Sequence, residues 1–237
     1  MIKTENGVYD IDPDDCYIRN HMMSGRVYEY HIINGYLKQF VTRSKYIVDA
    51  GANIGCHTVS YGLFNPECKI WSFEPQKKLF DILVKNVKQN NLKNRVKIYN
   101  AGLGHTEMDV NLVNIESVED KAHMGWNKGG MGIGKGGEKM KLMTIDSLDL
   151  PGLDYMKIDV EGAEGLVIQG AKKTIEKFHP IICFEHNGQR INPEDVGVKE
   201  VSTPFQELVK LGYRNFVYLD WENYLAIPEV SNHTPGE

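Results

Sequence analysis

Short apolar runs alternate with longer amphipathic segments along most of this chain. Five such runs predict core strands, over residues 46–48, 69–74, 95–100, 154–159 and 180–185. Between them, apolar residues recur at helical spacing over residues 161–178 and over residues 76–91, where Leu79, Leu83 and Val87 form one row. Thr203 and Gln206 predict a capping box at the start of another helix. Strands that alternate with helices in this way predict an α/β fold, with a mostly parallel sheet and helices on both faces.

The N-terminal segment, residues 1–45, precedes the first core strand. Asn6-Gly7 predicts a hairpin turn, and residues 28–41 have the apolar spacing of a helix. We expect this segment to cap the site of a domain that spans residues 46–228.

Two polar stretches are interpreted as having no binding or catalytic role. Asp10, Asp12 and Asp14 alternate like the start of a calcium loop, but Pro13 interrupts them and the glutamate of the loop's twelfth position is absent. We interpret them as a solvated turn. The polar residues 229–237 predict a disordered tail.

The only low-complexity stretch is glycine-rich and covers residues 123–140, between strands predicted at 108–113 and 140–148. It comes close to a phosphate-binding G-x-x-x-x-G-K, but Gly136 stands where Ser or Thr would bind magnesium and no apolar strand precedes it. An NTPase is therefore not predicted. The composition favours a mobile lid over the substrate, with a merely disordered insertion as the alternative.

The first core strand runs directly into a glycine turn. Residues 46–55 read YIVDAGANIG, and the apolar run after them predicts a helix over 56–64. Glycines let a backbone approach a ligand closely, and a helix N-terminus offers free N–H groups. The spacing Gly51-x-x-x-Gly55 differs from the G-x-G-x-x-G of dinucleotide-binding turns, which argues against NAD or FAD. A tight turn without a ligand is the alternative.

Polar residues gather where the predicted strands end, and ligands of parallel α/β sheets bind outside these ends. Glu74 is placed to accept both hydrogen bonds of a ribose diol. Two of these residues have alternative explanations without a function. Glu161 taken alone fits an acid that stabilises a helix N-terminus, and His186 taken alone fits an ordinary loop histidine. The residues presented at five strand ends are Asp49, Glu74, Asn100 with Ala101, Asp159 with Glu161, and Glu185 with His186.

Lys157 interrupts an apolar strand that should be buried on both faces. By the period of two it shares a face with Asp159. A buried lysine needs a partner, and we expect Asp49 or Glu185 to supply it.

Composition narrows the class of protein. The chain has 237 residues, 41% hydrophobic and 25% charged, which suits one sizeable α/β domain. A net charge of −5 argues against a nucleic-acid backbone as the main partner. The four cysteines form no C-x-x-C pair, so no zinc site is predicted. Without a signal peptide or a membrane-length apolar run, the sequence predicts a soluble cytosolic protein of unknown oligomeric state.

Together these motifs resemble those of the FkbM-like methyltransferases. The matching segments are YIVDAGANIGCHT, WSFEP, NAGLG, MTIDSL, MKIDVEGAEGLVIQGA and PIICFEH, from about residue 25 to 186. The resemblance implies a Rossmann-like class I methyltransferase fold with a mostly parallel seven-stranded sheet. It also implies S-adenosylmethionine as the methyl donor and transfer to an oxygen, often a hydroxyl of a sugar, a glycan or a small natural product.

The resemblance implies that the glycine turn and Glu74 bind the cofactor and that Asp159 and Glu161 face the reacting centre. The residues at the strand ends and beside them extend both sets. Those expected to bind the cofactor are Asp49, Gly51, Ala52, Asn53, Gly55, Thr58, Glu74, Pro75, Asn100, Ala101 and Asp159. Those expected to act at the reacting centre are Asp159 and Glu161 first, then His186, Glu185 and Lys157.

Methyl transfer to an alcohol needs positioning and a group that removes the hydroxyl proton. We favour a metal-free base, with carboxylates that hold Mg²⁺ as the alternative. A non-catalytic cofactor-binding domain is the rival from another class. An enzyme that methylates nitrogen is disfavoured because the N/DPPY-type sequence is absent after the fourth strand.

Overall fold

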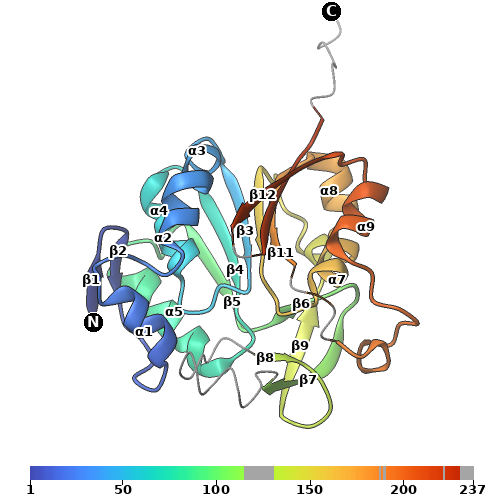
Figure 1. The fold of residues 1–237 in the computed structure, drawn as a ribbon, viewed down its shortest axis with the longest axis horizontal. Coiled ribbons are helices and arrows are strands. Elements are labelled where there is room, and N and C mark those ends of the chain that lie inside the picture. The colour runs from blue at the N-terminus through green and yellow to red at the C-terminus, as the bar shows by residue number, and fades with distance from the viewer. Residues whose placement is uncertain (115–130, 187, 189–190, 221, 230–237) are drawn as a thin grey trace, which may run out of the picture.

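A seven-stranded sheet forms the centre of the computed structural model, which describes residues 1–114, 131–186, 188, 191–220 and 222–229 (Figure 1). In spatial order its strands are β12 (Asn215–Asp220), β13 (Asn223–Ile227), β11 (Ile181–Glu185), β10 (Tyr155–Ile158), β3 (Tyr46–Ala50), β4 (Lys69–Phe73) and β5 (Val96–Tyr99). The strands from β11 to β5 are parallel, and β13 runs antiparallel to both of its neighbours. The mostly parallel sheet that the hydrophobic pattern predicts is confirmed.

Helices cover both faces of this sheet. Figure 1 shows α4 (Cys56–Phe64) and α5 (Lys77–Gln89) on one side, and α7 (Glu164–Gln169), α8 (Lys172–Phe178) and α9 (Pro204–Lys210) on the other. Alternate strand residues feed two separate apolar cores because successive side chains point to opposite faces. Ile47 and Tyr155 face α4 and α5, whereas Val48 and Met156 face α7 and α8.

The N-terminal segment packs on the α4 and α5 side. It contains the hairpin β1 (Ile2–Thr4) and β2 (Gly7–Tyr9), then α1 (Cys16–Met22), α2 (Tyr30–Ile32), the π-helical turn η1 (Ile33–Leu37) and α3 (Lys38–Val41). The predicted hairpin at Asn6-Gly7 and the predicted helical stretch are confirmed. Buried residues of this segment join the same apolar core as the sheet, so the segment and the sheet share one interior.

The prediction of a solvated turn is wrong for Asp12. Its side chain is fully buried and accepts hydrogen bonds from the Lys78 ammonium at 2.8 Å and from the Asp14 backbone N–H at 3.0 Å. The local sequence pattern could not show this burial, because the partner cation, Lys78, comes from α5 (Lys77–Gln89).

A second, four-stranded sheet lies at the carboxyl end of the central one. Its order is β6 (Gly102–Leu103), β9 (Glu138–Met143), β7 (Met108–Asn114) and β8 (Met131–Ile133). The expected continuous loop over 123–140 is therefore corrected, since β8 and the start of β9 flank β7 at Leu112. The expected strand over 140–148 ends at Met143, and a 3₁₀ turn, η2 (Ile145–Leu148), follows it.

Parts of these predictions fall outside the described residues. They are residues 123–130 of the expected lid and residues 230–237 of the expected tail. A further 3₁₀ turn, η3 (Pro193–Val196), precedes α9, whose predicted Thr203/Gln206 capping box is confirmed.

The single helix predicted over 161–178 is also corrected. Glu161 and Gly162 have left-handed backbones, with φ of 56° and 96°, so α7 begins at Glu164. At Gly170, where α7 ends, a Cβ atom would lie 1.9 Å from the Gly104 carbonyl oxygen. The helical segment is thus interrupted where it packs against the loop after β6.

Candidate active site

A cavity of about 750 Å³ opens at the carboxyl ends of β3, β4, β10 and β11. The central sheet, the N-terminal segment and the second sheet all line it. From the central sheet and its loops come Gly51, Ala52, Asn53, Cys56, His57, Phe73, Glu74, Pro75, Gln76, Lys157, Asp159, Val160, Glu161, Ala163 and Glu185. From the N-terminal segment come Tyr17, Ile18, Tyr28 and Glu29, and from the second sheet and the loop before it come Ala101, Gly102, Leu103, Leu112, Met131, Gly132, Ile133, Met140 and Leu142.

The glycine turn forms one wall because only glycine fits at its first bend. Gly51 has a φ of 80°, and a Cβ atom there would lie 1.7 Å from the Asp159 carbonyl oxygen. The backbone N–H groups of Gly51 and Ala52 donate to the Phe73 carbonyl at 3.1 and 2.9 Å. This locks the turn between β4 and β10 and exposes its surface to the cavity.

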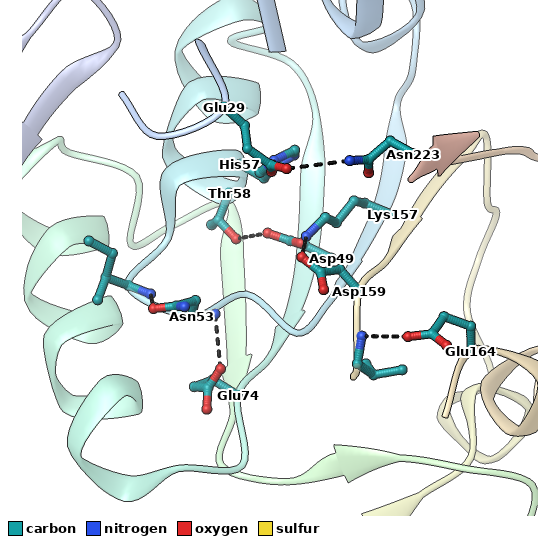
Figure 2. Close-up of polar contacts among 12 residues, drawn as sticks. Glu29, Asp49, Asn53, His57, Thr58, Glu74, Lys157, Asp159, Glu164 and Asn223 are labelled. Carbon is teal, nitrogen blue, oxygen red and sulfur yellow. Dashed lines mark hydrogen bonds and ion pairs between the residues drawn. The ribbon is translucent and has the colours of Figure 1, made fainter. Parts of the chain in front are cut away.

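Glu74 braces the turn from the end of β4 (Figure 2). Its carboxylate accepts the Asn53 backbone N–H at 2.9 Å and the Gln76 backbone N–H at 2.8 Å, one on each oxygen. Burial raises the pKa of Glu74 to about 7, although these two hydrogen bonds lower it. The negative charges of Asp159 and Asp49 add to the rise. Each oxygen keeps a further lone pair that can accept a hydrogen bond from a ligand.

Three of the predicted cofactor residues support the turn from below. Asp49 is fully buried, and its Oδ2 accepts the Thr58 hydroxyl at 2.5 Å. Its Oδ1 has no hydrogen-bond partner among the described residues. Gly55, with φ of 96°, begins α4. None of the three lines the cavity.

Asn100 and its neighbours form the adjacent wall. The Asn100 amide donates to the Glu74 and Pro75 carbonyls, both at 2.9 Å, and so fixes the loop after β4. Pro75 and Ala101 line the cavity, whereas Asn100 does not. The small side chain of Ala101 leaves space there.

Lys157 is buried, and its partner differs from the predicted one. Its Nζ lies 2.7 Å from Asp159 Oδ2, the residue that shares its strand face, and not on Asp49 or Glu185 (Figure 2). Burial favours the neutral amine, but the negative charges of Asp159, Glu29 and Asp49 raise the pKa of Lys157 further than burial lowers it. Lys157 is a permanent cation at neutral pH.

The carboxylates beyond β10 and β11 crowd one another. Burial raises the pKa of Glu185 far above its ordinary value, and the charges of Asp159, Glu161 and Glu164 raise it further. Its Oε2 has no hydrogen-bond partner in the described chain. Glu161 also lines the cavity, at a left-handed backbone position.

Glu164 holds this loop in place. Its Oε1 accepts the backbone N–H groups of Val160 at 3.1 Å and Gly162 at 3.0 Å. Burial raises the pKa of Glu164 to about 7 despite these bonds.

His186 lies apart from the cavity. It borders a small separate hollow beside Gly162 and Glu164, and its ring packs edge-on against Phe205 with centroids 5.5 Å apart. The structure does not bring it to the other predicted residues.

The structure adds two residues that the sequence did not single out. Glu29, from the N-terminal segment, places Oε2 2.7 Å from His57 Nε2, and both line the cavity. A lone glutamate before a helix and a lone histidine within one carry no periodic signal, so sequence patterns could not have identified them.

Two further findings concern metals and membranes. Among the described residues, no group of three or more His, Cys, Asp or Glu side chains is arranged to hold a metal ion. The described part of the chain also has no helix with the length and apolarity needed to cross a membrane.

The cavity fits an adenosine-containing ligand on the side of the glycine turn. Its backbone can approach closely at Gly51, an acid with free lone pairs stands at Glu74, and the small Ala101 leaves room for a ring. These features are the ones that nucleoside binding at a switch point requires.

Comparisons with known proteins identify the family. The methyltransferase FkbM domain model matches residues 49–215. Hexuronic acid methyltransferase AglP of Haloferax volcanii is 26% identical over 149 residues, which are 62% of this chain and 58% of that protein. The crystal structure of methyltransferase FkbM from Methylobacillus flagellatus KT superposes with a TM-score of 0.53 at 16% identity, over 77% of this chain and 43% of that chain.

This chain thus spans less than two thirds of the length of either relative. This superposition and the mostly parallel seven-stranded sheet of the chain confirm the expected class I methyltransferase fold. The family model covers more than half of the sequence, from the acid of the first core strand to the start of β12. The chain belongs to the FkbM methyltransferase family.

Proposed function

We propose that this protein is an S-adenosylmethionine-dependent O-methyltransferase that acts on a hydroxyl of a sugar, a glycan or a small natural product. One observation carries the proposal: a single cavity joins the glycine turn and Glu74 to the Lys157–Asp159 pair and its neighbouring acids. The name of the Haloferax volcanii relative, a hexuronic acid methyltransferase, supports a sugar acceptor.

The cofactor half is assigned to the glycine-turn side. Gly51, Ala52 and Asn53 contact the cofactor through backbone, Glu74 accepts from its ribose, and Pro75 and Ala101 border its base. Asp49, Thr58 and Asn100 support these groups through the hydrogen bonds described above, and Gly55 ends the turn where α4 begins. S-adenosylmethionine supplies a methyl group carried on a positively charged sulfur.

The acceptor half is assigned to the side of β10 and β11. Asp159, fixed by Lys157, and Glu161 orient the acceptor hydroxyl beside the cofactor. Positioning of this kind accounts for most of the rate enhancement that a displacement reaction needs. Glu185 is protonated at neutral pH and serves as a hydrogen-bond donor rather than as a base. His186, outside the cavity, is the least favoured of the catalytic candidates.

The N-terminal segment and the second sheet border the acceptor. Tyr28 and Glu29 line the cavity from one side, and Met131, Ile133 and Met140 line it from another. We assign residues 1–45 as a cap, and β8 with the start of β9 as the cover of the acceptor side.

A methyl-transfer screen tests the function. The protein is incubated with S-adenosylmethionine tritiated on its methyl group and with a panel of sugars, glycans and small alcohols, with calorimetry for cofactor binding. Transfer to a hydroxyl supports the proposal. Binding without transfer to any acceptor would favour the non-catalytic domain, and loss of transfer on chelation that Mg²⁺ restores would favour the metal-assisted alternative.

Variants of the acceptor side test the assignments. Single-turnover rates of Asp159→Asn and Glu161→Gln should fall while cofactor affinity changes little for Glu161→Gln. His186→Ala should stay close to wild type. Near-normal rates in both carboxylate variants would contradict their placement at the reacting centre.

A further inference from the structure

Glu29 enters the cavity from outside the central sheet. It lies just before α2, with a left-handed φ of 57°, a conformation that is uncommon for glutamate. Its side chain is 15% exposed, and its Oε2 lies 2.7 Å from His57 Nε2. Asn223 Nδ2 donates to its other oxygen at 3.5 Å (Figure 2). A backbone in this conformation, with its side chain held from two elements, indicates a functional constraint.

His57 connects Glu29 to buried hydroxyls. Its Nδ1 lies 2.7 Å from Tyr61 Oη, which in turn lies 3.3 Å from Tyr155 Oη. Burial raises the pKa of both phenols well above the ordinary value, so they keep their protons. With neutral His57, Nε2–H donates to Glu29 and the Tyr61 hydroxyl donates to Nδ1.

Most other carboxyl groups at the site already have an ion-pair partner, hydrogen-bond donors or a bound proton. Asp159 is held by Lys157 at 2.7 Å, and Glu74 accepts two backbone N–H groups of the cofactor side. Glu185 carries a proton at neutral pH because burial and neighbouring acids raise its pKa, so it cannot accept another.

Glu29, in contrast, is ionised. Burial favours its neutral form, but the hydrogen bond and charge of His57 and the charge of Lys157 hold the pKa of Glu29 well below its ordinary value. The titratable groups that face it are Tyr28, Cys56, His57, Tyr61, Lys157 and Cys183. Burial raises the pKa of the two thiols to about 12 and raises that of the two phenols, and Lys157 stays charged.

We propose that Glu29 accepts the proton of the acceptor hydroxyl and that His57 positions Glu29 for this step. The proposal rests on the O-methyltransferase function proposed above. In the step, the acceptor's O–H bond breaks while its oxygen forms the bond to the methyl carbon. The electron pair of the broken sulfur–carbon bond stays on the sulfur of the released product. The proton ends on Glu29, which becomes a neutral carboxylic acid beside His57, and it leaves to solvent after product release.

The first experiment compares Glu29→Gln with wild type. Loss of a general base lowers rates by about 10²-fold or more, so kcat should fall by that factor. The affinity for S-adenosylmethionine, measured by calorimetry, should change by less than about twofold, since the affinity follows contacts that the variant keeps. The matched control is Glu5→Gln, an exposed carboxylate of the same segment that bonds to Tyr30 and lies outside the cavity. Its kcat should stay near that of wild type.

The second experiment compares His57→Gln, which can still donate to Glu29, with His57→Phe, which cannot. If His57 positions Glu29, kcat should fall more in His57→Phe than in His57→Gln, while KM changes little. Imidazole nitrogen NMR of the cofactor-loaded protein gives a readout apart from activity. In Glu29→Gln the Nε2 resonance of His57 should shift, because an amide replaces the carboxylate that accepts its hydrogen bond.

The outcomes separate the two proposals. A wild type that transfers methyl groups, with Glu29→Gln equally fast, overturns the role of Glu29 alone. A parallel loss of cofactor affinity in Glu29→Gln also overturns it, since Glu29 would then be a binding residue. A wild type that methylates none of the acceptors contradicts the proposed function itself.

Discussion

At the scale of single residues, Glu74 combines a binding role with an unusual proton equilibrium. Only the ionised carboxylate accepts hydrogen bonds on both oxygens, and burial raises its pKa to about 7. Affinity for S-adenosylmethionine should therefore rise as the pH climbs through about 7. Glu74→Gln should weaken binding by about 1–3 kcal/mol and flatten this dependence. Calorimetry between pH 6 and 8 measures both, and an unchanged affinity would remove Glu74 from the site.

The ion pair of Lys157 also leads to a prediction about the free energy of unfolding. Lys157→Met leaves Asp159, Asp49 and Glu29 without their shared cation, and breaking a buried pair costs about 3–5 kcal/mol. We expect the low end, about 3 kcal/mol, because the Asp159 side chain is 31% exposed. Urea unfolding checks this. The double variant Lys157→Met/Asp159→Asn should recover part of the loss, and a double variant less stable than Lys157→Met would argue against the pair.

Residues at strand ends could be predicted from the sequence, and residues brought by other elements could not. Glu74 and Asp159 follow apolar strands, so topology alone places them at one edge of the sheet. His186 also follows a strand, but the loop after β11 turns it onto Phe205. Glu29 and His57 meet only because the N-terminal segment folds across α4, a contact without local signature.

At the scale of elements, the sequence predicted the strands and helices whose formation depends mainly on their own residues. The strands β3, β4, β10 and β11 are short apolar runs, and each was predicted within a few residues of its observed bounds. Strand β8 was missed because its glycine-rich sequence has little β propensity and its order comes from pairing with β7. The break between α7 and α8 was missed because it depends on the approach of Gly104 to Gly170.

The glycine turn yields a prediction for an element. Gly51→Ala would combine a left-handed backbone with a Cβ atom 1.7 Å from the Asp159 carbonyl oxygen, so β3 and β10 would have to move apart. We expect a loss of stability of more than about 2 kcal/mol, beyond the left-handed cost of about 1–2 kcal/mol alone. Gly197→Ala is the matched control, since its φ is 69° and a Cβ there meets nothing within 4 Å. Equal losses by urea unfolding in the two variants would refute the steric explanation.

At the scale of the whole molecule, the active-site cavity depends on parts that are far apart in sequence. The N-terminal segment contributes Tyr9, Ile33 and Leu37 to the core that also contains Ile47 of the sheet. The cap is therefore anchored in the same interior as the cofactor side. Its position over the cavity follows from this shared core, which makes Glu29 as fixed as the strand-end acids.

Burial of several acids gives the molecule a predictable pH dependence of stability. In the folded protein, the pKa values of Glu74 and Glu164 are raised from 4.5 to about 7, and their side chains are 4% and 3% exposed. Between these pH values the folded state binds more protons than the unfolded state. The free energy of unfolding therefore falls as the pH rises through this window. Each group contributes about 3 kcal/mol to the change, since one pKa unit corresponds to about 1.4 kcal/mol.

Urea unfolding of the ligand-free protein at pH 5 and pH 8 measures this dependence. We expect greater stability at pH 5, because there both carboxyl groups keep their protons in the fold. Glu164→Gln should reduce the difference by about a third, since it removes one of three contributing groups and leaves Glu74 and Glu185, whose pKa is also raised. Glu67→Gln, at an exposed position, should leave the difference unchanged. Stability that is equal at the two pH values, or greater at pH 8, would show that these carboxyl groups are ionised in the folded state.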